Sequence, residues 1–125
     1  MMSSLATRPS AQIAACEAEA SVRSARALLV EATSEIWDAV LAGRPVSAEQ
    51  RAILRVAATH ATASSARAVD LAYTAGGASA MYAKSPLQRC LRDVHAITQH
   101  FGVASYNHEV CGKILLGAEP DAPNL

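Results

Sequence analysis

Residues 76–100 read GGASAMYAKSPLQRCLRDVHAITQH, and this stretch contains the two signals that divide the second half of the chain into helices. Gly76 and Gly77 are expected to stop the preceding helix, because glycine readily adopts the backbone conformations in which helices end. Ser85 and Pro86 are expected to start a new helix, with Ser85 as the N-cap and Pro86 at the first helical position, where no N–H is needed. The stretch therefore predicts two helices joined by a Gly-Gly turn and a short connecting piece.

The first half of the chain predicts two longer helices. Over residues 11–42, apolar side chains recur at spacings of three, four, seven or eight, and no residue interrupts the helix. Gly43 is expected to end this helix in the left-handed conformation. Ser47, with Gln50 three residues later, forms a capping box that starts the second helix, which runs to about residues 73–75. Because the connection is short, the two helices are predicted to be antiparallel.

A third and a fourth helix are expected after Pro86. The third should end near Gly102, and its predicted apolar face contains Leu87, Leu91, Val94, Thr98 and Phe101. Ser105 is expected to cap the fourth helix, whose first turn contains Glu109 and which ends at Gly117.

No strand pattern occurs, so the sequence predicts an all-α fold, an up-down four-helix bundle. Residues 11–117 are assigned to the bundle. Residues 1–10 are expected to be a flexible N-terminus and residues 118–125 a flexible tail.

The composition predicts a thin core. The chain has 125 residues, of which 28 are alanine, while aromatic residues make up only 4%. Small side chains let helices approach closely but bury little apolar surface each. We therefore expect a homo-oligomer, a dimer or a tetramer, to complete the core.

Charge and cysteine content exclude other classes of partner. Eleven basic and eleven acidic residues give a net charge of zero, which offers no basic field for nucleic acid. No apolar run approaches the length of a membrane span, so no membrane partner is expected. The chain has an odd number of cysteines and no CxxC pair, its three cysteines being Cys16, Cys90 and Cys111. This pattern predicts reduced thiols and a cytoplasmic protein.

Spacing alone indicates no activity. The four histidines occur in no Glu-x-x-His pair, so no metal site is expected. Cys90 lies beside two arginines, yet a buried and inert cysteine is the preferred interpretation. Gly76 and Gly77 match neither a GxGxxG motif nor a P-loop.

The stretch from Gly76 to His100 nevertheless resembles the C-terminal domain of the acyl-CoA dehydrogenase superfamily. The shared pattern is a Gly-Gly turn, a spacer, Pro-x-x-Arg ending at Arg89, and the Arg-Asp pair at residues 92–93. The resemblance extends more loosely from about Arg8 to residue 117. It implies the helical domain of a flavoenzyme.

Within that superfamily the sequence is more similar to the two-component flavin-dependent monooxygenases. True dehydrogenases continue with an aromatic residue and a glutamate base, whereas this chain has Gly102 at about that position. Monooxygenase-like members have a histidine at the position of His100. The resemblance implies that His100 is the catalytic residue, which would assist the oxygen chemistry of the flavin or take the proton of a phenolic substrate.

The resemblance also implies a flavin, FMN or FAD, as cofactor. Gly76, Gly77 and Ser79 match a turn that approaches the flavin, often that of a neighbouring subunit, and Arg89 is a further candidate for cofactor binding. A partner flavin reductase is implied for the full enzyme. The family's N-terminal helical domain and β-domain are not in this sequence, so the isolated chain is expected to be inactive and to bind no flavin by itself. Two alternatives stay open: a domain of an acyl-CoA dehydrogenase, and a non-enzymatic oligomerising bundle.

Overall fold

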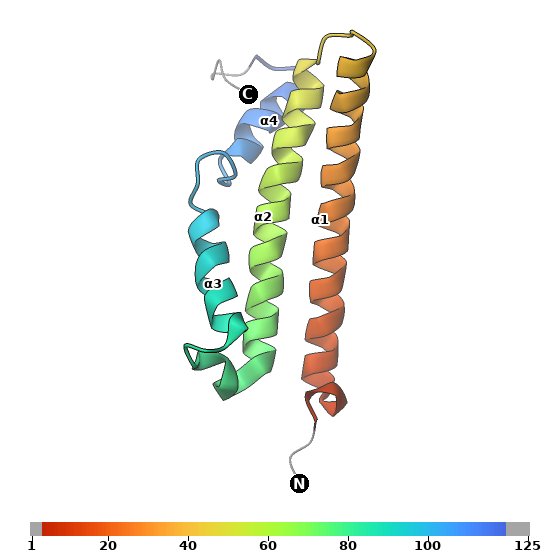
Figure 1. The fold of residues 1–125 in the computed structure, drawn as a ribbon. Coiled ribbons are helices and arrows are strands. Elements are labelled where there is room, and N and C mark those ends of the chain that lie inside the picture. Colours follow the sequence, from red (N-terminus) through yellow and green to blue (C-terminus); the bar gives the residue numbers. More distant parts are fainter. Residues whose placement is uncertain (1–3, 120–125) are drawn as a thin grey trace.

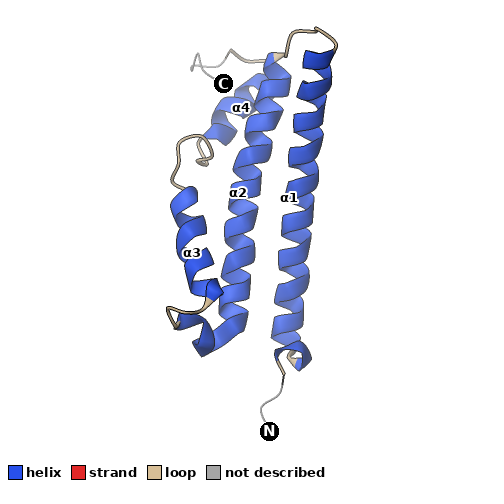
Figure 2. Ribbon diagram, in the orientation of Figure 1, coloured by secondary structure: helices blue, strands red, loops and turns tan. Residues whose placement is uncertain are grey.

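A computed structural model describes residues 4–119 of the chain, and this part is entirely helical (Figure 2). The elements are the 3-10 helix η1 (Leu5–Thr7), α1 (Pro9–Leu41), α2 (Ala48–Gly76), the 3-10 helix η2 (Gly77–Met81), α3 (Pro86–Ile97) and α4 (Asn107–Leu115). The predicted all-α fold with four helices is confirmed, and no strand occurs among these residues.

The helices lie in three columns, of which α2 forms the central one (Figure 1). The long helices α1 and α2 are antiparallel neighbours over most of their length. The shorter α3 and α4 follow one another along the other side of α2 and both pack against it. Helix α2 is therefore the central element, and its residues face neighbours on two sides.

The interior on both sides of α2 is built from small side chains. On α1 the buried residues are Ala25, Ala32 and Ala39, which are seven residues apart and therefore lie on one face of the helix. On α2 the buried residues are also small: Ala52, Ala57, Thr59, Ser64, Ala66 and Ala68. The thin core that the composition predicts is thus present in the described residues.

The predicted helix ends are mostly confirmed. Gly43 follows α1 with a φ of 67°. In the capping box, the Gln50 N–H donates to Ser47 Oγ and the Ser47 N–H donates to Gln50 Oε1, both at 3.0 Å. Pro86 opens α3, and Gly77 caps α2 with a φ of 59°. Each of these signals acts on backbone groups only a few residues away, so these helix ends can be predicted from the local sequence alone.

The second half of the chain differs from the prediction at three points. Helix α3 ends at Ile97 instead of near Gly102, so Phe101 leaves the predicted apolar face and is 70% exposed. Ser85 occupies the N-cap of α3 without a side-chain capping bond. Ser105 does not cap α4, which begins at Asn107 after Tyr106. The turn between α3 and α4 is therefore longer than expected.

The N-terminal boundary also differs. The range 1–10, assigned to the N-terminus, includes η1 and the first residues of α1. Residues 1–3 and 120–125 lie outside the described residues, so the flexibility expected for both ends stays a prediction. Within the described part, none of the helices combines the length and the apolar character needed to cross a membrane.

Candidate functional site

The turn between α3 and α4 presents His100 on the surface of the molecule. The His100 N–H donates to the Ile97 carbonyl at 3.0 Å, and the Val103 N–H donates to the His100 carbonyl at 3.0 Å. Two successive tight turns thus follow α3 and direct the chain toward α4. The imidazole of His100 is exposed and stacks on Phe101, with ring centroids 4.7 Å apart.

Two side chains hold the carbonyl groups of this turn. Arg55, in the first third of α2, donates from Nη1 to the Gly102 carbonyl at 3.2 Å. The buried Asn107 donates from Nδ2 to the carbonyls of Phe101 and Ala104, at 3.0 and 2.9 Å. The Ala104 carbonyl also accepts the Asn107 N–H at 3.1 Å, whereas the side chains of Arg55 and Asn107 supply donors to the Gly102 and Phe101 carbonyls, which lie outside the helices. The backbone beside His100 is therefore fixed at three points.

Gly102 contacts the imidazole directly. Its N–H donates to His100 Nδ1 at 3.1 Å. A Cβ at position 102 would lie 3.2 Å from Nδ1 and 3.3 Å from Cε1 of the same ring. Gly102 stands at about the position of the glutamate base of the dehydrogenases. In this structure, the glycine also leaves room for the ring of His100.

Both glycines of the Gly-Gly turn have local structural reasons. A Cβ at Gly76 would lie 3.0 Å from Leu87 Cδ1 and 3.1 Å from Ala80 Cβ, so Gly76 lets α2 end close to α3. Gly77 has a positive φ, and a Cβ there would meet nothing within 4 Å. The backbone at Gly77 is therefore open to the approach of another molecule. Ser79 is exposed and donates from Oγ to the Gly76 carbonyl at 2.7 Å.

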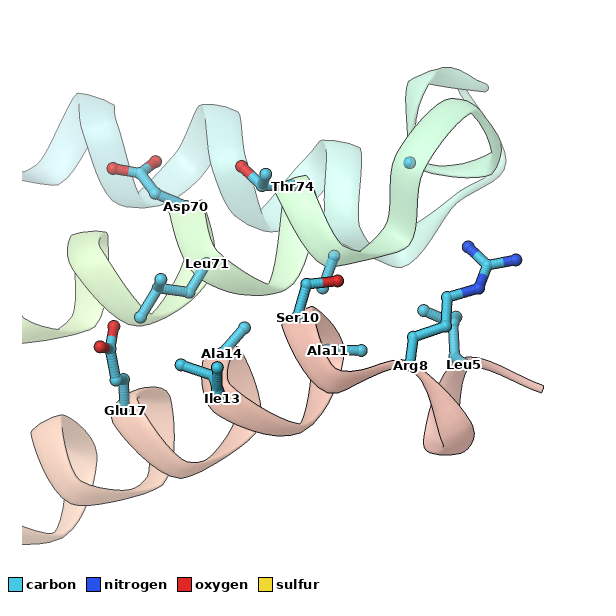
Figure 3. Close-up of a pocket in the computed structure, with 12 residues that line it drawn as sticks. Leu5, Arg8, Ser10, Ala11, Ile13, Ala14, Glu17, Asp70, Leu71 and Thr74 are labelled. Carbon is cyan, nitrogen blue, oxygen red and sulfur yellow. The ribbon is translucent and has the colours of Figure 1, made fainter. Parts of the chain in front are cut away.

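A groove of about 500 Å³ lies between the start of α1 and the end of α2 and includes Gly77 (Figure 3). Arg8 lies at the end of the groove near η1, and Glu17 and Asp70 lie toward the other end. Both carboxylates have partners: Glu17 forms an ion pair with Arg67 at 3.5 Å, and Asp70 forms a hydrogen bond with His95 Nε2 at 2.7 Å. Alanine and leucine side chains form the surface between them. The groove has an apolar centre and charged ends.

The structure does not bring all the predicted site residues together. The 12 residues of α3 separate the Gly-Gly turn from the turn of His100, a length of about 18 Å at the usual helical rise. Arg89 lies on the first turns of α3, is exposed, and pairs with Asp93 at 3.5 Å. The candidates thus form two separate regions, one at each end of α3.

Sequence reasoning did not identify Arg55 or Asn107. Arg55 reaches a residue 47 positions away, and no spacing pattern predicts such a contact. Asn107 follows Ser105, which appeared to be the better cap. In the sequence, Arg55 and Asn107 stand out only as polar residues within helices. The structure shows that Arg55 is partly buried and Asn107 is buried.

The cysteines differ from the expectation. Cys90 is exposed rather than buried, as is Cys16, and Cys111 is the buried one. Burial raises the pKa of the Cys111 thiol above its ordinary value of 9.0, and the charge of Arg55 partly opposes this rise. Within residues 4–119, no group of three or more potential ligands is arranged to hold a metal ion.

The family of acyl-CoA dehydrogenase C-terminal domains matches residues 1–105. The indole-3-acetate monooxygenase of Pseudomonas putida is 37% identical over 116 residues, which cover 93% of this chain and 30% of that protein. The oxygenase subunit HsaA, a flavin-dependent monooxygenase of Mycobacterium tuberculosis, is 32% identical over 92 residues, covering 74% of this chain and 23% of the relative.

A solved structure has the same fold. The 3-HSA hydroxylase from Rhodococcus sp. RHA1 superposes with a TM-score of 0.87 and 25% sequence identity, over 93% of this chain and 31% of that one. The chain thus spans less than a third of the length of each of these proteins.

Proposed function

This chain belongs to the family of acyl-CoA dehydrogenase C-terminal domains, and from this we propose that it serves as the C-terminal helical domain of a flavin-dependent monooxygenase. In that role it supplies helix contacts and part of a flavin pocket, while the remaining domains supply the rest. The names of the relatives, two monooxygenases and a hydroxylase, support oxygenation rather than dehydrogenation.

The observation that carries the proposal is the placement of His100. Its imidazole is exposed on a turn whose carbonyls are held by Arg55 and Asn107, so the ring has a defined position before any ligand binds. Preorganised polar groups are what an oxygenase site requires of its protein. Histidine suits proton transfer near neutral pH because its charge changes there.

Flavin, FMN or FAD, is the proposed cofactor, bound only together with the other domains. Gly76, Gly77 and Ser79 are proposed to lie near it, and Arg89 to contact its charged groups. The open backbone at Gly77 fits a flat or phosphorylated ligand. Flavin supplies the oxygen chemistry when bound, and this chain's residues orient it and exclude water.

The dehydrogenase alternative is less well supported. A glutamate at position 102 would place its Cβ 3.2 Å from the imidazole of His100, so a base at this position would crowd the ring. Incubation of the flavin-loaded enzyme with acyl-CoA thioesters would separate the two functions. Bleaching of the flavin by an acyl-CoA without a reductase would favour the dehydrogenase.

Partners are part of the same proposal. One relative is named an oxygenase subunit, which supports a separate flavin reductase for this protein. Homo-oligomerisation, as a dimer or a tetramer, is supported by apolar side chains on the α1 face opposite its buried alanines: Val30, Trp37 and Leu41, all exposed. Sedimentation of a well-folded monomer at micromolar concentration would contradict it.

A cytoplasmic location is proposed from the three free cysteines.

A chimera tests the function without requiring other domains of this protein. The chain replaces the matching C-terminal segment of the P. putida relative, and oxygen consumption that depends on indole-3-acetate is measured with reduced flavin. We expect activity, and we expect His100→Ala to lower kcat by about 100-fold, as for loss of one preorganised polar group at the reacting atoms. His108→Ala, an exposed histidine on α4, is the control and should leave kcat unchanged. Equal kcat for His100→Ala and the parent chimera would refute the proposed role.

A further inference from the structure

The imidazole of His100 has two different nitrogen atoms, and the structure distinguishes them. Nδ1 accepts the N–H of Gly102 at 3.1 Å. Among residues 4–119, no protein group forms a hydrogen bond with Nε2. A neutral imidazole has one N–H and one lone-pair nitrogen, and the partner of one nitrogen decides which is which. An Nδ1 that accepts a backbone N–H cannot also have a proton, so the proton is on Nε2.

The Gly102 N–H keeps this position because Arg55 holds the same residue from its other side. The guanidinium of Arg55 donates to the Gly102 carbonyl at 3.2 Å, which restricts rotation of the backbone around Gly102. Arg55 is partly buried on α2, the central helix, and charged donors form stronger hydrogen bonds than neutral ones. The contact therefore connects the orientation of a surface turn to the central helix of the fold.

From this arrangement we propose that Arg55 is a positioning residue that, through Gly102, holds His100 in the neutral tautomer with its proton on Nε2. Arg55 does not contact the outer edge of the ring. It holds the carbonyl of the peptide group that follows Gly102, while Asn107 holds the peptide group whose N–H selects the tautomer, through the Phe101 carbonyl at 3.0 Å. Glycine at position 102 favours the arrangement, because a Cβ there would crowd the ring at 3.2 Å from Nδ1.

The tautomer narrows what His100 can do. With Nδ1 occupied by Gly102, the outward nitrogen is a hydrogen-bond donor and has no lone pair with which to accept a proton. In the proposed monooxygenase, His100 therefore donates a hydrogen bond to the reacting groups rather than acting as a base toward a substrate hydroxyl. This catalytic reading rests on the proposed function, whereas the tautomer and the role of Arg55 do not.

The test is the tautomer itself, measured by NMR on the full 125-residue chain labelled with ¹⁵N-histidine. Long-range ¹H–¹⁵N correlations at a pH above the ordinary histidine range show which ring nitrogen has the proton. We expect His100 to be entirely in the Nε2–H form. A protonated Nδ1, or a mixture of both forms in the unmodified chain, would overturn the proposal.

Arg55→Met tests the positioning role, since methionine keeps an unbranched stem of similar reach but removes the donors. We expect a mixture of tautomers at His100 and about tenfold faster hydrogen exchange of the Gly102 amide, as for loss of a charge-assisted hydrogen bond. Arg51→Met is the matched control, because Arg51 and Arg55 line one surface hollow together with Gly102, but Arg51 donates to the Val46 carbonyl at 3.1 Å. An unchanged tautomer and unchanged Gly102 exchange in Arg55→Met would overturn the role of Arg55.

A second variant keeps the proposal testable if Arg55→Met does not fold. Gly102→Ala retains the Arg55 bond but displaces the ring, so it should also give mixed tautomers, and a pure Nε2–H form would contradict the proposal. The chimera's oxygen consumption is a separate readout. A pure tautomer with no hydroxylation would refute the proposed function alone, and a mixed tautomer with hydroxylation would refute this inference alone.

Discussion

His95 Nε2 lies 2.7 Å from Asp70 Oδ1, and this pair connects α3 to the central helix α2. The side chains of both residues are about half exposed. The pair lies between the two candidate regions, where it helps to hold α3, the element that sets their separation. Half-exposed pairs are screened by water and contribute little to stability.

A double-mutant cycle with His95→Ala and Asp70→Ala measures this contact. We expect a coupling energy of about 0.2–1 kcal/mol in urea unfolding, because water competes for both side chains. Adding salt should weaken the coupling if the imidazole is charged. Additive effects of the two substitutions would show that the pair contributes nothing to the placement of α3.

The alanines of α1 give a second prediction, based on the face of the helix. Ala32 packs against α2 and is only 2% exposed, whereas Ala27 on the same helix is exposed. Ala32→Leu should lower the free energy of unfolding by about 1–3 kcal/mol, because added methylenes separate tightly packed helices. Ala27→Leu is the matched control and should change it by less than about 0.5 kcal/mol. Similar losses for both variants in urea denaturation would argue against the close approach of α1 and α2.

The Gly-Gly turn gives a third prediction, since its two glycines are required for different reasons. Gly76→Ala places a Cβ 3.0 Å from Leu87 Cδ1 and 3.1 Å from Ala80 Cβ. Gly77→Ala meets no neighbour but requires an alanine at φ 59°, ψ −147°. We expect each substitution to cost about 1–3 kcal/mol, by crowding in the first case and by backbone strain in the second.

Gly112→Ala is the control for both, because Gly112 lies inside α4 with nothing within 4 Å of its Cβ position. It should stabilise the chain by up to about 1 kcal/mol, the difference in helix propensity. The melting temperatures of the three variants, measured under the same conditions, test these predictions: two should fall and that of Gly112→Ala should rise. A neutral Gly77→Ala would mean that the turn relaxes to another conformation.

These features show how far the sequence alone could predict the structure. The ends of α1 and α2 and the start of α3 were predictable, because Gly43, the Ser47–Gln50 capping box, Gly77 and Pro86 act on backbone groups a few residues away. The end of α3 was not. Thr98 and Phe101 continue its apolar spacing, but the chain leaves the helix after Ile97, and Arg55 and Asn107 bind carbonyls of the turn that follows.

The candidate site was predictable only in part, for the same reason. The choice of His100 came from family resemblance and not from any local pattern. The side chains that fix its surroundings come from α2 and α4, and such long-range contacts depend on how the helices pack. The Gly-Gly turn was located correctly as a helix stop, yet its separation from His100 follows only from the direction of α3 along α2.

The burial of Cys111 gives the last prediction, a dependence of stability on alkaline pH. Its thiol is 0% exposed, and burial raises its pKa above 9.0 because the thiolate would lose its hydration. The folded chain therefore holds this proton more tightly than the unfolded chain. The resulting stabilisation is complete below about pH 9, the ordinary pKa, and is lost as the pH rises through the higher pKa of the folded state.

Cys111→Ala should consequently lose less stability than the unmodified chain when the pH is raised past 9, so the difference between their melting temperatures should shrink. Cys90→Ala, which removes an exposed thiol, is the control and should follow the unmodified chain in parallel. Alkylation with iodoacetamide gives an independent check, since Cys16 and Cys90 should react in the folded chain and Cys111 only after unfolding. Rapid labelling of Cys111 in the folded state would show that α4 opens away from α2, and the alkaline loss of stability would then need another cause.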